Sequence, residues 1–167
     1  MSRTARWLLS LSIALVALFA TFGSAAAAPR AVDQPPDATA RLERAYKEEQ
    51  LRLAAMERRF NEAGAFAEKV AGMIAQLKEH GVDTARLERA LAAFRGRMAE
   101  AHRHWEAARD VLATHAGFDG EGHVTDMRQA RATVTTAHLH LMRAHTLADR
   151  AFRELRAVLA TYPRPER

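Results

Sequence analysis

Apolar residues recur every seven positions through most of the chain between residues 37 and 162. In the first part the two rows, interrupted only at Glu49, are Leu42, Glu49, Met56, Ala63, Val70 and Leu77, with Tyr46, Leu53, Phe60, Ala67 and Ile74. In the second they are Leu87, Phe94, Ala101 and Ala108, with Leu91, Met98, Trp105 and Leu112. In the third they are Met127, Val134, Leu141, Ala148, Leu155 and Tyr162, with Ala130, Ala137, Ala144, Ala151 and Val158. Sustained heptads predict helices that pack knobs into holes.

Glycine, proline and acidic residues mark where these helices begin and end. Gly81 ends the first, Asp83 caps the second, and Pro163 stops the third. The helices are therefore expected at residues 37–80, 83–115 and 126–162, with a C-terminal tail at 163–167. Short connections make neighbouring helices antiparallel. The predicted fold is all-α, an elongated antiparallel three-helix bundle with coiled-coil-like heptad packing.

The N-terminal residues differ in character from the rest of the chain. Residues 1–28 begin with "MSRTARW", continue with an uncharged apolar run and end in "GSAAAA". That order is typical of a secretory signal peptide with its cleavage site. Residues 29–36 then form a proline-rich lead. We expect an exported protein, periplasmic or extracellular, without membrane attachment after cleavage; an uncleaved segment would instead anchor it to the membrane as a stalk.

Composition narrows the classes of function. The chain has no cysteine, so no disulfide stabilises the fold. The net charge is +5, but basic and acidic residues are interleaved, as on a solvated helical surface and unlike a nucleic-acid patch. No serine follows Ser24, and no glycine-rich phosphate loop is present. The sequence therefore favours a non-enzymatic protein that does not bind nucleic acid.

The stretch "HAGFDGEGHVTD", residues 115–126, has the acidic and glycine content of a calcium loop. If Gly122 takes the invariant glycine position, Asp119 and Glu121 fall on ligand positions. However, Gly117 and Arg128 then occupy the first and last ligand positions, and the last requires a glutamate. We therefore predict a connector and no calcium site, with Gly117 in the left-handed conformation and Asp126 capping the third helix.

Four histidines are candidate metal ligands: His102 and His104 on the second helix, His138 and His140 on the third. Residues two apart on a helix point about 200° away from each other, so neither His-x-His pair can hold one metal alone. Across the two helices, His102 can meet His138, or His104 can meet His140. Such a pair, aided by Glu100 or Glu106, suits Zn²⁺, Ni²⁺ or Cu²⁺. The alternatives are half-exposed polar residues without a ligand, or a pH response near pH 6.

Residues 132–142, "ATVTTAHLHLM", carry no charged side chain. Leu139 falls at an outward heptad position, with Val134 and Thr135 nearby. Such a face is a candidate surface for an unknown protein partner or for a homo-oligomer. The alternative is that the bundle itself covers more of the third helix there.

The arrangement of signal, proline lead, heptad helices and the "GFDGEGHVTD" connector resembles short exported bacterial helical proteins of uncharacterised function. It is also similar in architecture to the periplasmic Spy/CpxP group of helical stress chaperones, which carry an L-T-x-x-Q motif. In "VTDMRQ" Gln129 lies four residues after Thr125, where the motif has three. No chaperone residue is therefore carried over. The expected function is protein–protein interaction or self-assembly, and the alternative is divalent metal binding or buffering.

Overall fold

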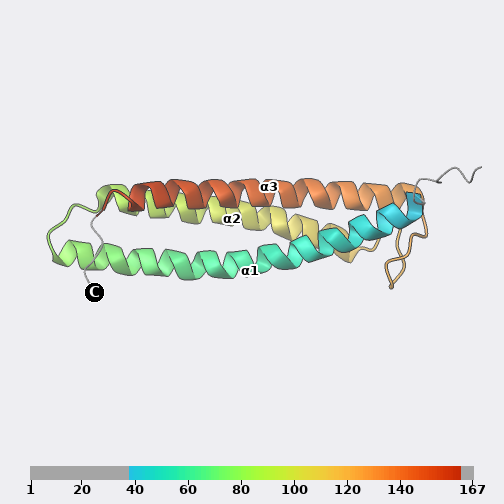
Figure 1. Ribbon diagram of the computed structural model, residues 1–167, viewed down its shortest axis with the longest axis horizontal. Coiled ribbons are helices and arrows are strands. Elements are labelled where there is room, and N and C mark those ends of the chain that lie inside the picture. The colour runs from blue at the N-terminus through green and yellow to red at the C-terminus, as the bar shows by residue number, and fades with distance from the viewer. Residues whose placement is uncertain (1–37, 163–167) are drawn as a thin grey trace, which may run out of the picture. The chain divides into compact units, whose positions relative to one another are not determined.

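The structure is a computed structural model that describes residues 38–162. These residues form three α-helices and no β-strand: α1 (Ala38–Glu79), α2 (Ala85–Ala113) and α3 (Met127–Leu159). The helices run up, down and up, so α1 and α3 are parallel and α2 is antiparallel to both (Figure 1). The prediction of an all-α three-helix bundle is confirmed. The expected signal peptide, proline-rich lead and tail lie outside the described residues and stay predictions.

The helix ends lie near the predicted positions, with different local capping. Thr84 holds the N-cap position of α2, while the Asp83 carboxylate accepts a hydrogen bond from the Ala85 N–H at 2.9 Å. Asp126 caps α3 as predicted, because its carboxylate accepts from the backbone N–H groups of Arg128 and Gln129. Helix α3 ends at Leu159 and not near residue 162, and turns follow it.

Helices α2 and α3 share the most extensive interface of the bundle, and alanine forms much of it. The alanines of the interface have no solvent exposure: Ala101, Ala108, Ala130, Ala137, Ala144, Ala148 and Ala151. Small side chains allow two helices to approach closely, which extends the van der Waals contact along the seam. The α2–α3 hairpin is therefore the tightest part of the fold.

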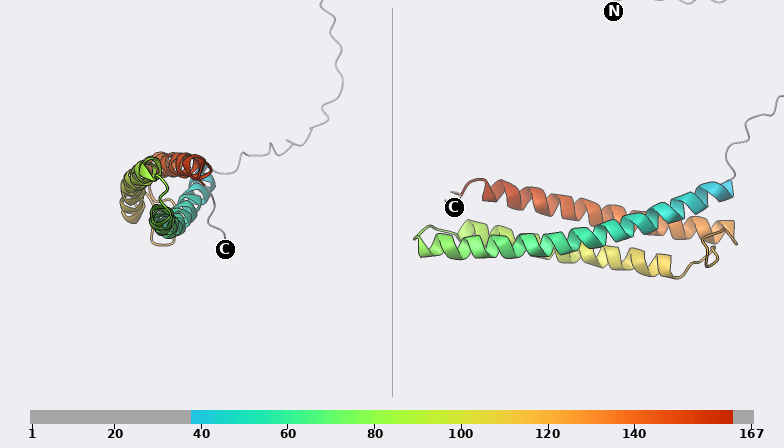
Figure 2. Two further views of the ribbon diagram at one scale, coloured as in Figure 1. Left: turned by 90° about the vertical axis from the view of Figure 1, so that its left-hand side faces the viewer. Right: turned by 60° about the horizontal axis from the view of Figure 1, so that its bottom comes forward.

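Helix α1 packs on this hairpin with larger side chains. The rings of Phe66 on α1, Phe94 on α2 and Phe152 on α3 have centroids 5.2–5.8 Å apart. Trp105 on α2 donates its indole N–H to the Leu53 carbonyl on α1 at 2.9 Å. Figure 2 shows α1 crossing obliquely toward the end of the bundle that holds the α2–α3 connector. The α1–α3 seam therefore varies along its length.

The connector between α2 and α3 is fixed to the bundle by ring stacking and hydrogen bonds around Tyr46. Phe118 stacks on Tyr46 of α1 with ring centroids 4.1 Å apart. The Tyr46 hydroxyl lies 3.1 Å from the Leu112 carbonyl, to which it donates, and 2.9 Å from the His115 Nδ1. Burial raises the pKa of Tyr46, which keeps the hydroxyl protonated. Gly117 has φ +86°, as predicted for a left-handed glycine.

Candidate functional site

The structure brings one of the two expected histidine pairs together. His104 on α2 and His140 on α3 have their Nδ1 atoms 3.2 Å apart, with ring centroids 5.5 Å apart and an interplanar angle of 38°. The close approach of α2 and α3 along the alanine seam places the two rings within reach. Both rings are half-buried. Of the two predicted histidine pairings, only His104 with His140 is found within residues 38–162.

The environment of His104 favours its neutral form. Burial lowers the pKa of His104 below its ordinary value of 6.5, and the neighbouring His140, Arg143 and Arg103 lower it further. Glu100, one turn before His104 on α2, acts in the opposite direction. A neutral imidazole has one nitrogen with a free lone pair, and it is the form that binds metals. His104 is therefore suited to ligation at neutral pH.

The alternative pairing of His102 with His138 is not present, because both side chains turn toward α1 and not toward each other. His102 packs against Phe60 of α1 at 5.0 Å and against Trp105 at 5.1 Å, and its Nδ1 lies 3.6 Å from Glu106. His138 turns to Glu49 of α1. In a bundle of three, α1 separates the outer edges of α2 and α3 on one side and leaves the other side in contact.

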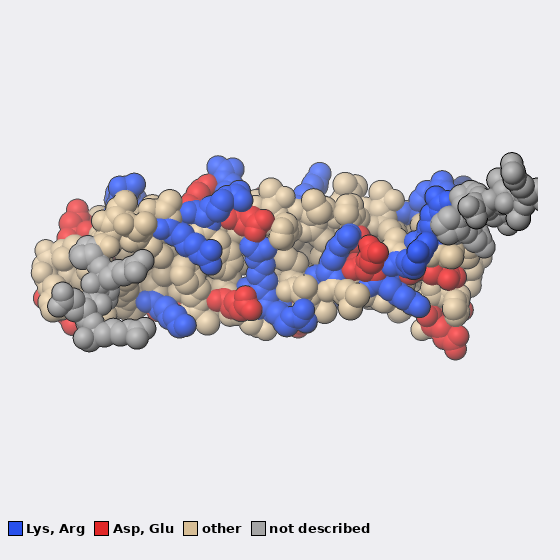
Figure 3. Space-filling model, viewed as in Figure 1, with Lys and Arg blue, Asp and Glu red and all other residues tan. Residues whose placement is uncertain are grey.

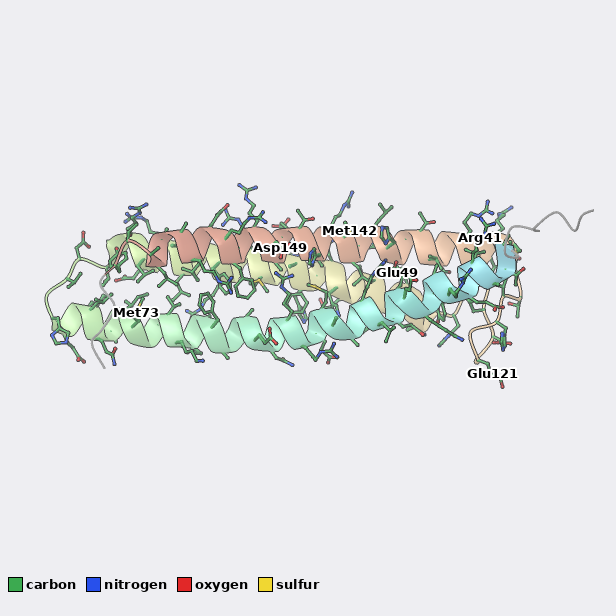
Figure 4. The ribbon with its side chains drawn as sticks, in the orientation of Figure 1. Arg41, Glu49, Met73, Glu121, Met142 and Asp149 are labelled. Atoms are coloured by element: carbon green, nitrogen blue, oxygen red, sulfur yellow. The ribbon has the colours of Figure 1, made fainter. Side chains whose placement is uncertain are left out.

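Glu49, the single break in the heptad rows, forms a buried polar contact between α1 and α3. Its side chain is only 3% exposed, and its Oε1 contacts His138 Nδ1 at 2.9 Å and Arg52. Arg52 also lies 3.2 Å from His138 Nδ1. The second carboxylate oxygen, Oε2, is buried without a hydrogen-bond partner. Figure 4 shows Glu49 where α1 approaches α3.

A second polar contact joins the same helices one heptad further along. Arg59 on α1 donates to His145 Nδ1 at 3.0 Å and pairs with Asp149, and His145 Nε2 lies 3.1 Å from the Asp149 carboxylate. The hydrogen bond from Arg59 lowers the pKa of Asp149. The arginine–histidine separation is 86 residues in both contacts, because parallel helices keep a constant offset. Two arginines and two histidines seven residues apart are the sequence signal that would have revealed this seam.

Between these two polar contacts the α1–α3 seam is hollowed. The hollow has a volume of about 430 Å³, with the two arginines and two histidines just described at its margins and an apolar floor. The apolar lining consists of Met56 and Leu141, which are buried, and of Ala55 and Met142, which are exposed. A site with an apolar floor and a cationic margin can accept an anionic amphiphile, but both arginines already have carboxylate partners within the bundle.

The candidate partner surface on α3 is partly as predicted. Leu139 is 55% exposed and Met142 is 49% exposed, and Thr135 is exposed too. Val134 is half-buried and packs on the cluster around Tyr46, as its place in the heptad row predicts, and it therefore contributes less to a partner surface. A second hollow of about 460 Å³ lies beside the exposed pair. Its lining residues include Glu100 and His104 from α2 and Leu139, Met142 and Arg143 from α3. The exposed apolar residues and the histidine pair therefore share one face.

The connector uses its acidic residues to hold its own backbone. The Asp119 carboxylate accepts hydrogen bonds from the backbone N–H groups of Glu121 and His123, at 2.9 and 2.8 Å. These bonds lower the pKa of Asp119. Glu43 of α1 accepts from the Val124 N–H at 3.1 Å and so ties the connector to the bundle. This geometry supports the interpretation of residues 115–126 as a connector.

Charges of both signs are spread along the face of the bundle that Figure 3 shows. Within residues 38–162, no group of three His, Cys, Asp or Glu side chains is arranged to hold a metal ion. None of the helices in this part of the chain combines the length and apolar character needed to cross a membrane. Any metal bound by the histidine pair would therefore take its remaining ligands from outside the described chain.

Comparisons of the chain with models of protein families, with curated proteins and with solved structures gave no match. The fold is shown by the structure alone, and the resemblance to exported helical proteins stays untested. The class that the structure defines is an all-α three-helix bundle.

Proposed function

We propose that this protein is a non-enzymatic, exported interaction protein that assembles with a second copy of itself through the outer face of α3. The observation that carries this proposal is the exposed pair Leu139 and Met142, which lie about one turn apart in the uncharged stretch 132–142. Most other large apolar side chains of the described helices are buried or half-buried. Neighbouring exposed apolar side chains become favourable when a partner covers them, so this face is the candidate for the interaction site.

The absence of charge in this stretch favours a second copy as the partner. A twofold interface places the same patch of both copies face to face, so any charge in it meets a like charge. Residues 132–142 avoid this repulsion, and their polar members are neutral threonines and histidines. Arg143 and Glu100 at the border of the hollow offer one charge of each sign. The face is thus self-compatible.

Analytical ultracentrifugation of the purified protein over a range of concentrations tests this proposal. We expect a monomer–dimer equilibrium for the wild-type protein and weaker association for Leu139→Glu, because each copy then buries a charge in the interface. Leu51→Glu is the matched control, since Leu51 is 70% exposed on α1 and lies in a charged segment. It should associate like the wild type.

Circular dichroism melts should show that both variants keep the fold, because both side chains are exposed. A wild-type protein that stays monomeric at all concentrations would contradict the proposal. So would equal loss of association in the Leu51 and Leu139 variants. Export is tested separately by sequencing the N-terminus of the mature protein, which should begin after residue 26, 27 or 28.

A further inference from the structure

We propose that His104 and His140 form half of a transition-metal site, and that the same pair from a second copy completes it across the α3 face. This inference rests on the proposed self-assembly through that face. Zn²⁺ is the first candidate because it is bound by imidazole nitrogens in tetrahedral sites. The metal would lie on the twofold axis of the dimer.

The distance between the two nitrogens fits a shared metal. Zn²⁺ binds histidine nitrogen at about 2.0–2.1 Å. Two nitrogens separated by 3.2 Å, as in His104 and His140, then subtend an angle of about 100–106° at the metal, near the tetrahedral value of about 109°. The pair therefore already has the separation of two ligands on one tetrahedral edge. Because the ring centroids lie 5.5 Å apart, the two nitrogens point at each other, so binding requires both rings to turn toward a common metal position while the helices keep their places.

The coordination sphere is half complete within one chain. A tetrahedral site needs four ligands, and the described residues provide no third protein ligand to the pair. Glu100 is the nearest acidic neighbour of His104 on α2 that the structure identifies, and it lines the adjoining hollow. A twofold axis through the metal supplies two more imidazoles without any additional residue.

The apolar neighbours of the pair explain why a second copy is preferred to water as the source of the missing ligands. Leu139 and Met142 line the hollow that His104 borders. When two copies meet there, these side chains leave water together and surround the metal with an apolar rim. Exclusion of water strengthens the bond between a cation and its ligands. Metal binding and burial of the apolar face therefore support each other.

The test combines stoichiometry with association. Protein treated with a chelator is titrated with Zn²⁺ by calorimetry, and its dimerisation is measured with and without the metal. We expect one Zn²⁺ for two chains and a dimer at least about tenfold tighter with the metal. Co²⁺ should give the visible absorption of a tetrahedral ion. His140→Ala should abolish the metal effect, and His102→Ala, on the same helix as His104 but outside the pair, should retain it.

The outcomes separate this inference from the proposed function. Dimers that form through Leu139 and ignore Zn²⁺ would overturn the metal site and leave the proposed self-assembly standing. One Zn²⁺ bound per chain without tighter association would also overturn it, as would a metal effect that survives His140→Ala. If neither association nor metal binding is observed, both proposals fail. The metal-free contact is then a hydrogen bond between two neutral rings.

Discussion

Replacing the buried carboxylate of Glu49 with an apolar side chain should stabilise the protein. Glu49 occupies a core position of the α1 heptads, its side chain is 3% exposed, and its Oε2 is buried without a partner. Glu49→Leu restores the heptad with a side chain of similar size. The variant removes the polar contact with Arg52 and His138, but both partners are half-exposed and regain water, and Arg52 keeps Glu48 at 3.5 Å.

The size of the effect follows from three contributions. The two methyl groups of leucine, which take the place of the carboxylate oxygens, contribute about 0.8 kcal/mol each. Removal of an unsatisfied buried oxygen contributes about 1–3 kcal/mol. Against these, the ion pairs to two half-exposed partners are worth at most about 1 kcal/mol each, because solvent screens them. Since area-based gains are upper estimates, we expect a net stabilisation of about 1–3 kcal/mol.

Urea denaturation followed by circular dichroism measures this difference directly as a change in the free energy of unfolding. Glu49→Gln is the control, because it keeps the shape and removes the charge without adding apolar surface, and it should change the stability by no more than about 1 kcal/mol in either direction. A free energy of unfolding that is higher for Glu49→Leu than for the wild type and for Glu49→Gln supports the reasoning. A Leu variant less stable than the wild type would refute it, and would mean that the contact with Arg52 and His138 is worth more than its exposure suggests.

Two further predictions concern glycine conformation and histidine protonation. Gly117→Ala should lower the free energy of unfolding by more than about 3 kcal/mol, because φ is +86° and a Cβ would lie 2.1 Å from the Ala130 backbone nitrogen. Gly81→Ala, with φ +73° and open space around it, should lower it by about 1–2 kcal/mol in the same urea titration. Because His104 has a folded-state pKa below 6.5, the unfolded chain takes up the proton first, so the metal-free protein should lose stability as pH falls below about 6.5 toward that folded pKa. Thermal melts of His104→Gln between about pH 5.5 and 7.5 should show a smaller loss, and an equal loss would contradict this.

The heptad rows predicted the fold because burial along a helix repeats with a period close to the helical turn. Every member of the two α2 rows is buried, from Leu87 and Leu91 to Ala108 and Leu112. Whether a residue in a row is buried depends on the sequence pattern around it and on the one apolar seam that the row faces. Such information is local, and a single sequence contains it.

The partners of the histidines were less predictable, because they depend on the placement of a third helix. When only α2 and α3 are considered, the two edges of this helix pair are equivalent. The structure keeps His104 with His140 and turns His138 toward Glu49, since α1 covers that edge. Only the position of α1 against the other two helices distinguishes the two edges, and the periodicity of each helix does not specify that position.

The connector shows a similar limit at the level of the backbone. A glycine after a helix favours the left-handed conformation, and Gly117 adopts it. However, the residue that directly follows the C-cap of α2 is His115, and it also has a positive φ, 51°. His115 is held there by the contact of its Nδ1 with the Tyr46 hydroxyl at 2.9 Å. Gly117 is required for another reason, the close approach of the Ala130 backbone. Both causes are tertiary contacts.

The polar seam between α1 and α3 also answers a question that heptads leave open. Apolar rows that repeat every seven residues pack almost equally well after a slip of one heptad, so they do not fix the register alone. At the observed offset of 86 residues, Arg52 and Arg59 each face a histidine. A slip in one direction would put Arg131 in the place of His138, against both Arg52 and Glu49, and would move Asp149 away from Arg59. A slip in the other would put Arg156 in the place of the carboxylate that pairs with Arg59. Both slips therefore remove the Arg59–Asp149 contact, and the second also opposes two arginines, so the polar seam contributes to a single alignment of the helices.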